Sequence, residues 1–235
     1  MERKNVTKPG FIIQAAGVLD LDEALMLARC GATHLGFPLG PGVRTPDMDL
    51  AGVAEVAGAL PEGVAGVAIT YLDRAGDVRD LVRAAGLRAV QLHAPVSVVE
   101  LARLRVQEPD WFIIKSLVVG RGTEEDVLTE MRLASPHVNA FLTDTFDPET
   151  GASGATGKPH DWAVSRTLAR AGLGPVILAG GLNPDNVARA VRAVRPAGVD
   201  AHTGLERADG RKDEEKTALF VSRASQAVAS FSEAL

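Results

Sequence analysis

Carboxylic and imidazole side chains end several apolar runs of the chain. Asp144 ends the run 138–144, His93 ends the run 89–93, and His202 ends the run 198–202. A carboxyl group and an imidazole can act together as general acid and base, because the unperturbed pKa of histidine is near ~6.5. These residue types therefore favour chemistry by proton transfer.

Two glycine-containing turns near the C-terminal end predict an anion site. Gly180 and Gly181 end one apolar run, and Thr203 and Gly204 follow the next one. Glycine lets the backbone approach an anion closely, and exposed N–H groups then bind it. In α/β barrels the turns after strands seven and eight often bind phosphate. The alternative interpretation is a pair of tight turns without a ligand.

These residues need a scaffold that brings the ends of the apolar runs together. Strands are predicted at 11–16, 33–37, 63–71, 89–93, 111–117, 138–144, 175–180 and 198–202. Amphipathic helices are predicted at 21–30, 50–60, 78–85, 97–106, 124–133, 161–171, 183–194 and 213–231. Regular alternation predicts a parallel sheet of βαβ units. Eight units favour an α/β fold closed into a (β/α)8 TIM barrel over a doubly wound open sheet.

Length and composition limit the class of protein. The 235 residues, 46% of them hydrophobic, suit a single domain spanning residues 1–235 with its own core. A net charge of -5 without runs of one sign argues against nucleic acid or an anionic membrane as a partner. The one cysteine, Cys30, permits no intramolecular disulfide, and no apolar segment approaches ~20 residues. We therefore expect a cytoplasmic protein.

Several segments resemble the phosphoribosylanthranilate isomerase family, in the family's order along the chain. They are the segments 91–93, 156–162, 178–187, 194–200, 203–206 and 212–213. The resemblance covers the chain from about residue 11 to near the C-terminus. It implies an Amadori rearrangement in tryptophan biosynthesis, in which a phosphorylated aminoaldose opens and becomes an aminoketose without cofactor or metal. The resemblance also implies a monomer or a homodimer.

The resemblance also implies roles for individual residues. The family's general acid is an aspartate that ends strand six, and Asp144 matches it. The residues expected to bind the phosphorylated sugar are Arg44, His93, Gly157 and Gln14, and those expected to bind its phosphate are Gly180, Gly181, Thr203 and Gly204. The loop 147–154 contains glycines that permit closure over a ligand, or it is an exposed loop without function.

The sequence departs from the family on its first strand. Ala16 stands where the family has its cysteine base, and Gln14 replaces a lysine. Alanine cannot accept a proton, and general base catalysis contributes roughly 10²–10⁴-fold to a rate. Cys30 follows the first helix and is expected at the other end of the barrel. The loss of the lysine removes a cation beside Asp200, which tends to raise the pKa of that carboxyl.

A histidine stands where the family has a small hydroxyl residue. His202 is expected to act as a replacement base or phosphate ligand, or else to pack over the sheet and bond to a loop carbonyl. Lys115, at the end of the fifth strand, offers an aldolase-like Schiff base as a further alternative.

Three functions are consistent with these residues. The leading hypothesis is a phosphosugar isomerase with a changed substrate, since the family's base is Ala16. The alternatives are a genuine phosphoribosylanthranilate isomerase with a substitute base, and a non-catalytic barrel that binds a phosphosugar or a protein partner. The retained Asp144 favours catalysis, because a barrel that only binds needs no acid at its mouth.

Overall fold

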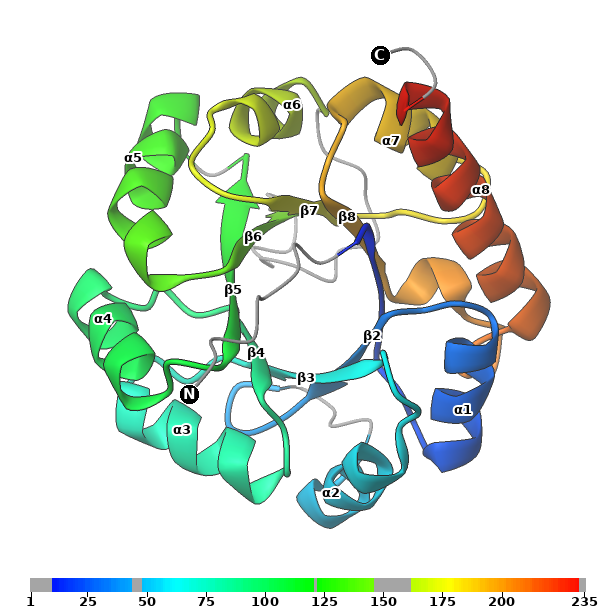
Figure 1. Ribbon diagram of the computed structural model, residues 1–235, viewed down its shortest axis with the longest axis horizontal. Helices are drawn as coiled ribbons and strands as arrows, with labels where there is room; N and C mark the ends of the chain where they lie inside the picture. Colours follow the sequence, from blue (N-terminus) through cyan, green and yellow to red (C-terminus); the bar gives the residue numbers. More distant parts are fainter. Residues whose placement is uncertain (1–9, 44–47, 121, 146–161, 233–235) are drawn as a thin grey trace, which may run out of the picture.

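Eight parallel strands close into a barrel that is surrounded by helices (Figure 1). The computed structural model describes residues 10–43, 48–120, 122–145 and 162–232. The strands are β1 (Ile12–Ala16), β2 (His34–Pro38), β3 (Ala65–Thr70), β4 (Ala89–Leu92), β5 (Phe112–Val119), β6 (Ala140–Thr145), β7 (Val176–Leu178) and β8 (Gly198–Ala201). The predicted (β/α)8 barrel is confirmed.

The helices follow the strands in strict alternation. They are α1 (Leu21–Arg29), α2 (Leu50–Ala59), α3 (Ala75–Ala84), α4 (Val98–Gln107), α5 (Glu124–Ala134), α6 (Trp162–Arg170), α7 (Val187–Val194) and α8 (Glu214–Ser232). Two short 3₁₀ helices, η1 (Ser135–His137) and η2 (Thr203–Leu205), follow α5 and β8.

Pairing of the first and last strands closes the sheet. Gln14 of β1 lies opposite His34 of β2 on one side and opposite Asp200 of β8 on the other. All these pairings are parallel, so the C-terminal ends of the strands meet at one rim of the barrel. That rim is the mouth at which polar residues from distant parts of the sequence can come together.

Alternation along each strand divides the core into two clusters. One cluster fills the inside of the ring and includes Ile12, Val67, Ile114, Leu142 and Ile177. The other lies between the strands and the helices, where the neighbours of these residues in the sequence pack outward. A residue two positions beyond an inward-facing one therefore also faces the inside of the barrel.

Most predicted elements are found within a few residues of their expected ends, and α7 shows the largest difference. It begins at Val187, with Asn186 as its N-cap residue, instead of at residue 183. The Asn183 side chain accepts hydrogen bonds from the N–H groups of Asp185 and Asn186, at 2.9 and 3.2 Å. This local turn competes with the helix for the same backbone groups.

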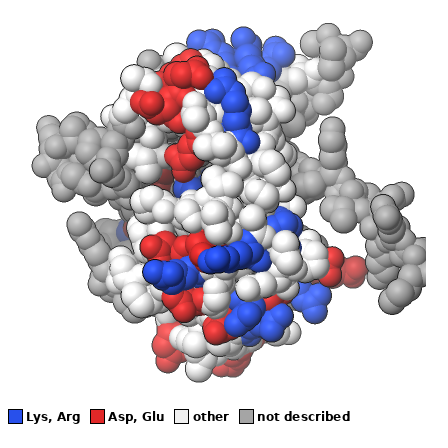
Figure 2. All heavy atoms as spheres, turned by 90° about the vertical axis from the view of Figure 1, so that its left-hand side faces the viewer, with Lys and Arg blue, Asp and Glu red and all other residues white. Residues whose placement is uncertain are grey.

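Charges of both signs are interspersed on the face formed by α3, α4 and α5 (Figure 2). Ion pairs there include Arg103 with Glu100, and Arg132 with Glu125 at 2.8 Å. This face thus carries no patch of one sign. Within the described ranges, no helix is long and apolar enough to cross a membrane.

Candidate active site

The inner face of the barrel carries polar side chains near the mouth. Gln14 and Ala16 follow the inward-facing Ile12, and Gln91 and His93 follow Ala89. Asp144 follows Leu142 in the same way on β6, so its carboxyl also faces the inside of the ring.

Asp144 and His93 face each other across the mouth. Asp144 is only 6% exposed, and its Oδ2 lies 3.7 Å from His93 Nδ1. Burial lowers the pKa of His93 to about 4, and the charge of Lys115 acts in the same direction. Tyr71 stacks on the imidazole with ring centroids 5.3 Å apart. His93 is therefore a neutral, fixed neighbour of the predicted acid at physiological pH.

A second set of polar groups lies one step deeper in the barrel. The Gln14 side chain is fully buried, and its Nε2 donates to Gln91 Oε1 at 2.7 Å and to Asp200 Oδ1 at 3.0 Å. The other end of the Gln91 amide contacts His93 Nε2 at 2.7 Å. Burial raises the pKa of Asp200 to about 7 and the nearby Asp144 adds to this, while the bond from Gln14 opposes it.

His202 lies beside the position where the family has its base. Gly17, the residue after Ala16, has φ +77°, and a Cβ added there would lie 2.2 Å from His202 Nε2. The imidazole thus covers the end of β1. Its Nε2 lies 3.2 Å from Glu206 Oε1, which also pairs with Lys212 Nζ at 2.8 Å. The predicted position of His202 at the mouth agrees with this arrangement.

The two turns predicted to bind phosphate pack directly against each other. A Cβ on Gly204 would lie 1.9 Å from the carbonyl oxygen of Leu182, so this contact requires glycine. Asn186 Nδ2 donates to the carbonyl of Gly181 at 2.9 Å and holds the first turn. Gly180 and Gly181 both have positive φ, and Thr203 opens η2.

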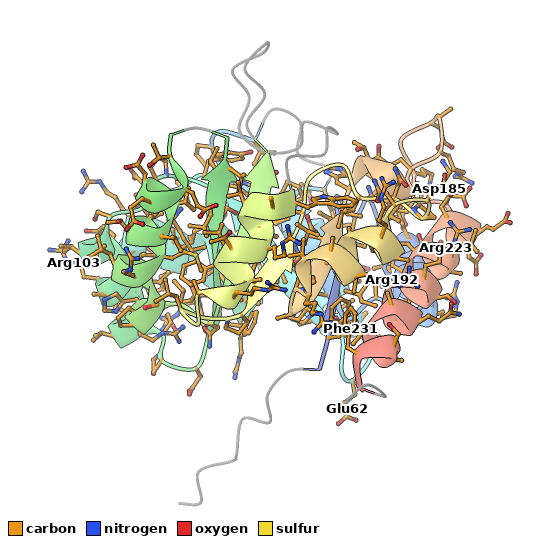
Figure 3. The ribbon with its side chains drawn as sticks, turned by 90° about the horizontal axis from the view of Figure 1, so that it is seen from above. Glu62, Arg103, Asp185, Arg192, Arg223 and Phe231 are labelled. Atoms are coloured by element: carbon orange, nitrogen blue, oxygen red, sulfur yellow. The ribbon has the colours of Figure 1, made fainter. Side chains whose placement is uncertain are left out.

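Helix α8 supports the first of these turns from outside. Arg223 donates to the carbonyl of Pro184 at 2.7 Å and pairs with Asp185 at 3.0 Å. Both charged residues lie on the same side of the molecule (Figure 3). The loop that begins α7 is therefore held between the barrel and α8.

Other candidate residues lie away from the mouth or outside the described ranges. Arg44 and Gly157 belong to the residues that the structure does not describe. Lys115 faces outward, where its Nζ lies 3.0 Å from Glu130 of α5, so the Schiff-base alternative is wrong.

Cys30 ends α1, and its thiol donates to the carbonyl of Glu214 of α8, outside the ring of strands. Across the described residues, no group of three His, Cys, Asp or Glu side chains can hold a metal.

Known proteins match this chain over most of its length. Residues 53–223 match the family described as N-(5′-phosphoribosyl)anthranilate (PRA) isomerase. The chain belongs to the phosphoribosylanthranilate isomerase family. It is 38% identical over 214 residues to N-(5′-phosphoribosyl)anthranilate isomerase 2 of Methanosarcina mazei. The match covers 90% of this chain and 93% of that relative.

Further phosphoribosylanthranilate isomerases agree with this assignment. The enzyme of Haloferax volcanii is 35% identical over 216 residues, which is 92% of this chain and 93% of that relative. The crystal structure of phosphoribosyl anthranilate isomerase from Thermotoga maritima has a TM-score of 0.77 and 26% identity, and the match covers 92% of this chain and 99% of that one. The chain is therefore an isomerase of this family, as predicted.

Two polar residues of the isomerase mouth were not among the predicted site residues. Gln91 was noted only as part of a family segment, and Asp200 only as the former partner of a lysine. Their spacing was a usable signal, because each stands on a strand, two residues before a histidine that directly follows that strand.

Proposed function

We propose that this chain catalyses the isomerisation of N-(5′-phosphoribosyl)anthranilate, with Asp144 as general acid and His202 as general base. The observation that carries the proposal is the imidazole of His202, which lies against Gly17 beside the vacant base position at Ala16. The identity to isomerases of this name favours the ordinary substrate over the changed substrate that Ala16 suggested.

The first step opens the sugar ring. Asp144 gives a proton to the ring oxygen while the bond between that oxygen and C1 breaks, and the anthranilate nitrogen forms an iminium with C1. Because Asp144 is buried beside a neutral His93, the carboxylate that forms meets an ordered polar neighbour instead of bulk water.

The second step moves hydrogen from C2 to C1. His202 takes the proton from C2, and the electron pair of that bond forms a C1–C2 double bond as the iminium becomes an amine. The resulting enol yields the ketone when its hydroxyl proton returns to the Asp144 carboxylate and the imidazolium gives its proton to C1. Atoms and electrons balance without an added oxidant or reductant.

The pair of His202 and Glu206 suits a general base. Glu206 Oε1 lies 3.2 Å from His202 Nε2, the ring nitrogen nearest to Gly17, and holds the imidazole in place there. The carboxylate also stabilises the imidazolium that forms when the base takes a proton, as in other imidazole–carboxylate pairs.

The phosphate of the substrate fits the turns at Gly181 and Gly204. Backbone N–H groups at such turns bind anions without a net positive charge on the protein. The contact between Gly204 and Leu182 holds the two turns together, so both can contribute to one phosphate.

Turnover of N-(5′-phosphoribosyl)anthranilate by the purified protein tests the proposal, with loss of anthranilate fluorescence as the measurement. We expect His202→Ala and Asp144→Asn each to lower kcat by about 10²-fold or more. His137→Ala is the matched control, because His137 belongs to η1, which precedes β6 and so lies at the end of the barrel opposite the mouth, and it should leave kcat unchanged.

A specific outcome would favour the non-catalytic alternative. If the wild-type protein turns over no faster than Asp144→Asn, yet both bind a ribose 5-phosphate derivative equally well, the chain is a phosphosugar-binding barrel. Growth of a tryptophan auxotroph that lacks the isomerase, when supplied with the wild-type chain, would exclude that alternative.

A further inference from the structure

A chain of polar contacts crosses the barrel beneath the mouth, from Asp200 to Asp144. Asp200 belongs to β8, Gln14 to β1, Gln91 to β4 and Asp144 to β6, while His93 directly follows β4. The bond between Gln14 and Gln91 joins residues 77 positions apart in the sequence, on strands that do not pair with each other. The contacts are therefore made by side chains alone.

The first amide of this chain has a fixed direction. Gln14 Nε2 donates to Asp200 Oδ1 and to Gln91 Oε1, and beside an ionised Asp200 turning the amide would place oxygen against oxygen at 3.0 Å. Within the described part of the chain, Gln14 Oε1 has no hydrogen-bond partner. Leaving a buried acceptor unpaired costs free energy, so the Asp200 carboxylate, which can only accept, imposes this orientation.

The orientation of the Gln14 amide determines the orientation of the Gln91 amide and, through it, the tautomer of His93. Gln91 turns its oxygen toward Gln14, and its Nε2 therefore faces His93 Nε2 at 2.7 Å. An amide nitrogen only donates, so His93 Nε2 accepts and carries no proton. In a neutral imidazole the proton then lies on Nδ1, the atom 3.7 Å from Asp144 Oδ2.

We propose that Gln14 and Gln91 are positioning residues that fix His93 in its Nδ1–H tautomer, so that this N–H faces the carboxyl of Asp144. The inference rests on the proposed function for the role of Asp144 as the acid. An N–H dipole aimed at that carboxyl stabilises the negative charge that forms when Asp144 gives up its proton. The opposite tautomer would aim a lone pair at the same charge and slow ring opening.

Two substitutions at residue 14 separate the effect of hydrogen-bond direction from the effect of side-chain packing. A lysine has only donors, so Gln14→Lys can still donate to Gln91 Oε1 and Asp200 Oδ1 and keeps the direction of the chain. In Gln14→Glu the new carboxyl shares one proton with Asp200, so toward Gln91 it can only accept and draws the Gln91 Nε2 toward itself. Gln91 would then aim its oxygen at His93, whose Nε2 would have to carry the proton.

Nitrogen NMR of the imidazole reads the tautomer directly, without substrate. Long-range proton–nitrogen spectra of protein with labelled histidine identify the His93 signals by their loss in His93→Asn. Free histidine prefers the Nε2–H form, so an Nδ1–H form is a departure from the default. At about pH 8.5, where Asp200 with its pKa of about 7 is ionised, we expect about a tenfold excess of Nδ1–H in the wild type and in Gln14→Lys. We expect the Nε2–H form in Gln14→Glu.

An Nε2–H signal in the wild type would overturn the inference, and so would an unchanged tautomer in Gln14→Glu. If Gln14→Glu does not fold, Gln91→Leu replaces it: losing the donor to His93 should remove the Nδ1–H excess, and a retained excess would contradict the inference. Because the spectra are recorded without turnover, a failed tautomer test and a failed activity assay can be told apart. Where the tautomer test and the activity assay both succeed, kcat should fall more than KM rises in Gln14→Glu. In Gln14→Lys, kcat should stay near the wild-type value.

Discussion

At the scale of single residues, a thiol at Ala16 tests what the base position requires. Ala16 lies opposite Gly36 of β2, which has no side chain, and His202 lies against the next residue, Gly17. If the rest of the mouth performs the family's reaction, Ala16→Cys restores a second base. We expect kcat to rise about 10-fold or more, measured with N-(5′-phosphoribosyl)anthranilate.

Two companion variants make this result specific to the base. Ala16→Ser adds a group of similar size with far weaker basicity and should leave kcat near the wild-type value. In the double variant Ala16→Cys, His202→Ala, the thiolate should replace the imidazole and retain activity that His202→Ala alone loses. A double variant as slow as His202→Ala would mean that residue 16 does not reach the substrate.

The residues at the mouth differ in how well the sequence predicts them. Asp144 and His202 could be placed because each ends an apolar run at the rim where the strands meet. Lys115 could not, because Ile113 and Ile114 are both apolar, and a parallel barrel buries both faces of each strand. The pattern thus gives no sign of which face Lys115 takes. The hydrogen bond from Gln14 to Gln91 could not be predicted either, since it crosses the inside of the barrel and depends on the closure of the sheet.

At the scale of elements, the contact between the β7 and β8 turns depends on one glycine. Gly204→Ala would place a Cβ 1.9 Å from the Leu182 carbonyl, and backbone on both sides must move. We expect a loss of about 1–3 kcal/mol in the free energy of unfolding, the usual cost of overpacking. Affinity for inorganic phosphate should fall as well, because the two turns separate. Urea unfolding and phosphate titration measure these effects.

Gly58→Ala in α2 is the matched control for this substitution. A Cβ at Gly58 meets nothing within 4 Å, and alanine inside a helix is favoured over glycine by roughly 0.5–1 kcal/mol. This variant should gain stability and bind phosphate as the wild type does. Equal phosphate affinity in Gly204→Ala and Gly58→Ala would argue against a phosphate site at the turns.

Element boundaries were predicted less well than the elements themselves, for a local reason. Asn183 and Pro184 are favourable residues for the start of a helix, but the Asn183 side chain binds the N–H groups of the two residues that follow Pro184. The helix therefore starts after this turn. The alternation of apolar runs and amphipathic stretches predicted the number and order of elements, because each strand must be covered by a helix.

At the scale of the whole molecule, buried titratable groups predict how stability depends on pH. Burial lowers the pKa of His34 and of His93 from 6.5 to about 4, and burial raises the pKa of Asp200 from 3.8 to about 7. The two histidines stabilise the fold at high pH, and this contribution is lost as pH falls from 6.5 toward 4. The Asp200 contribution has the opposite sign and is lost as pH rises from 3.8 toward 7.

Between pH 5 and 6 the two effects compete, and the histidines prevail. The unfolded chain binds two more protons at the histidines and one fewer at Asp200, a difference of 2 − 1 = 1 proton. The free energy of unfolding should therefore rise by about 1 kcal/mol over this pH unit. Asp200→Asn removes the opposing group and should roughly double the slope, whereas His34→Gln should bring it near zero. Urea unfolding at both pH values measures the slopes, and an equal slope in all three proteins would mean that these groups do not titrate as their burial requires.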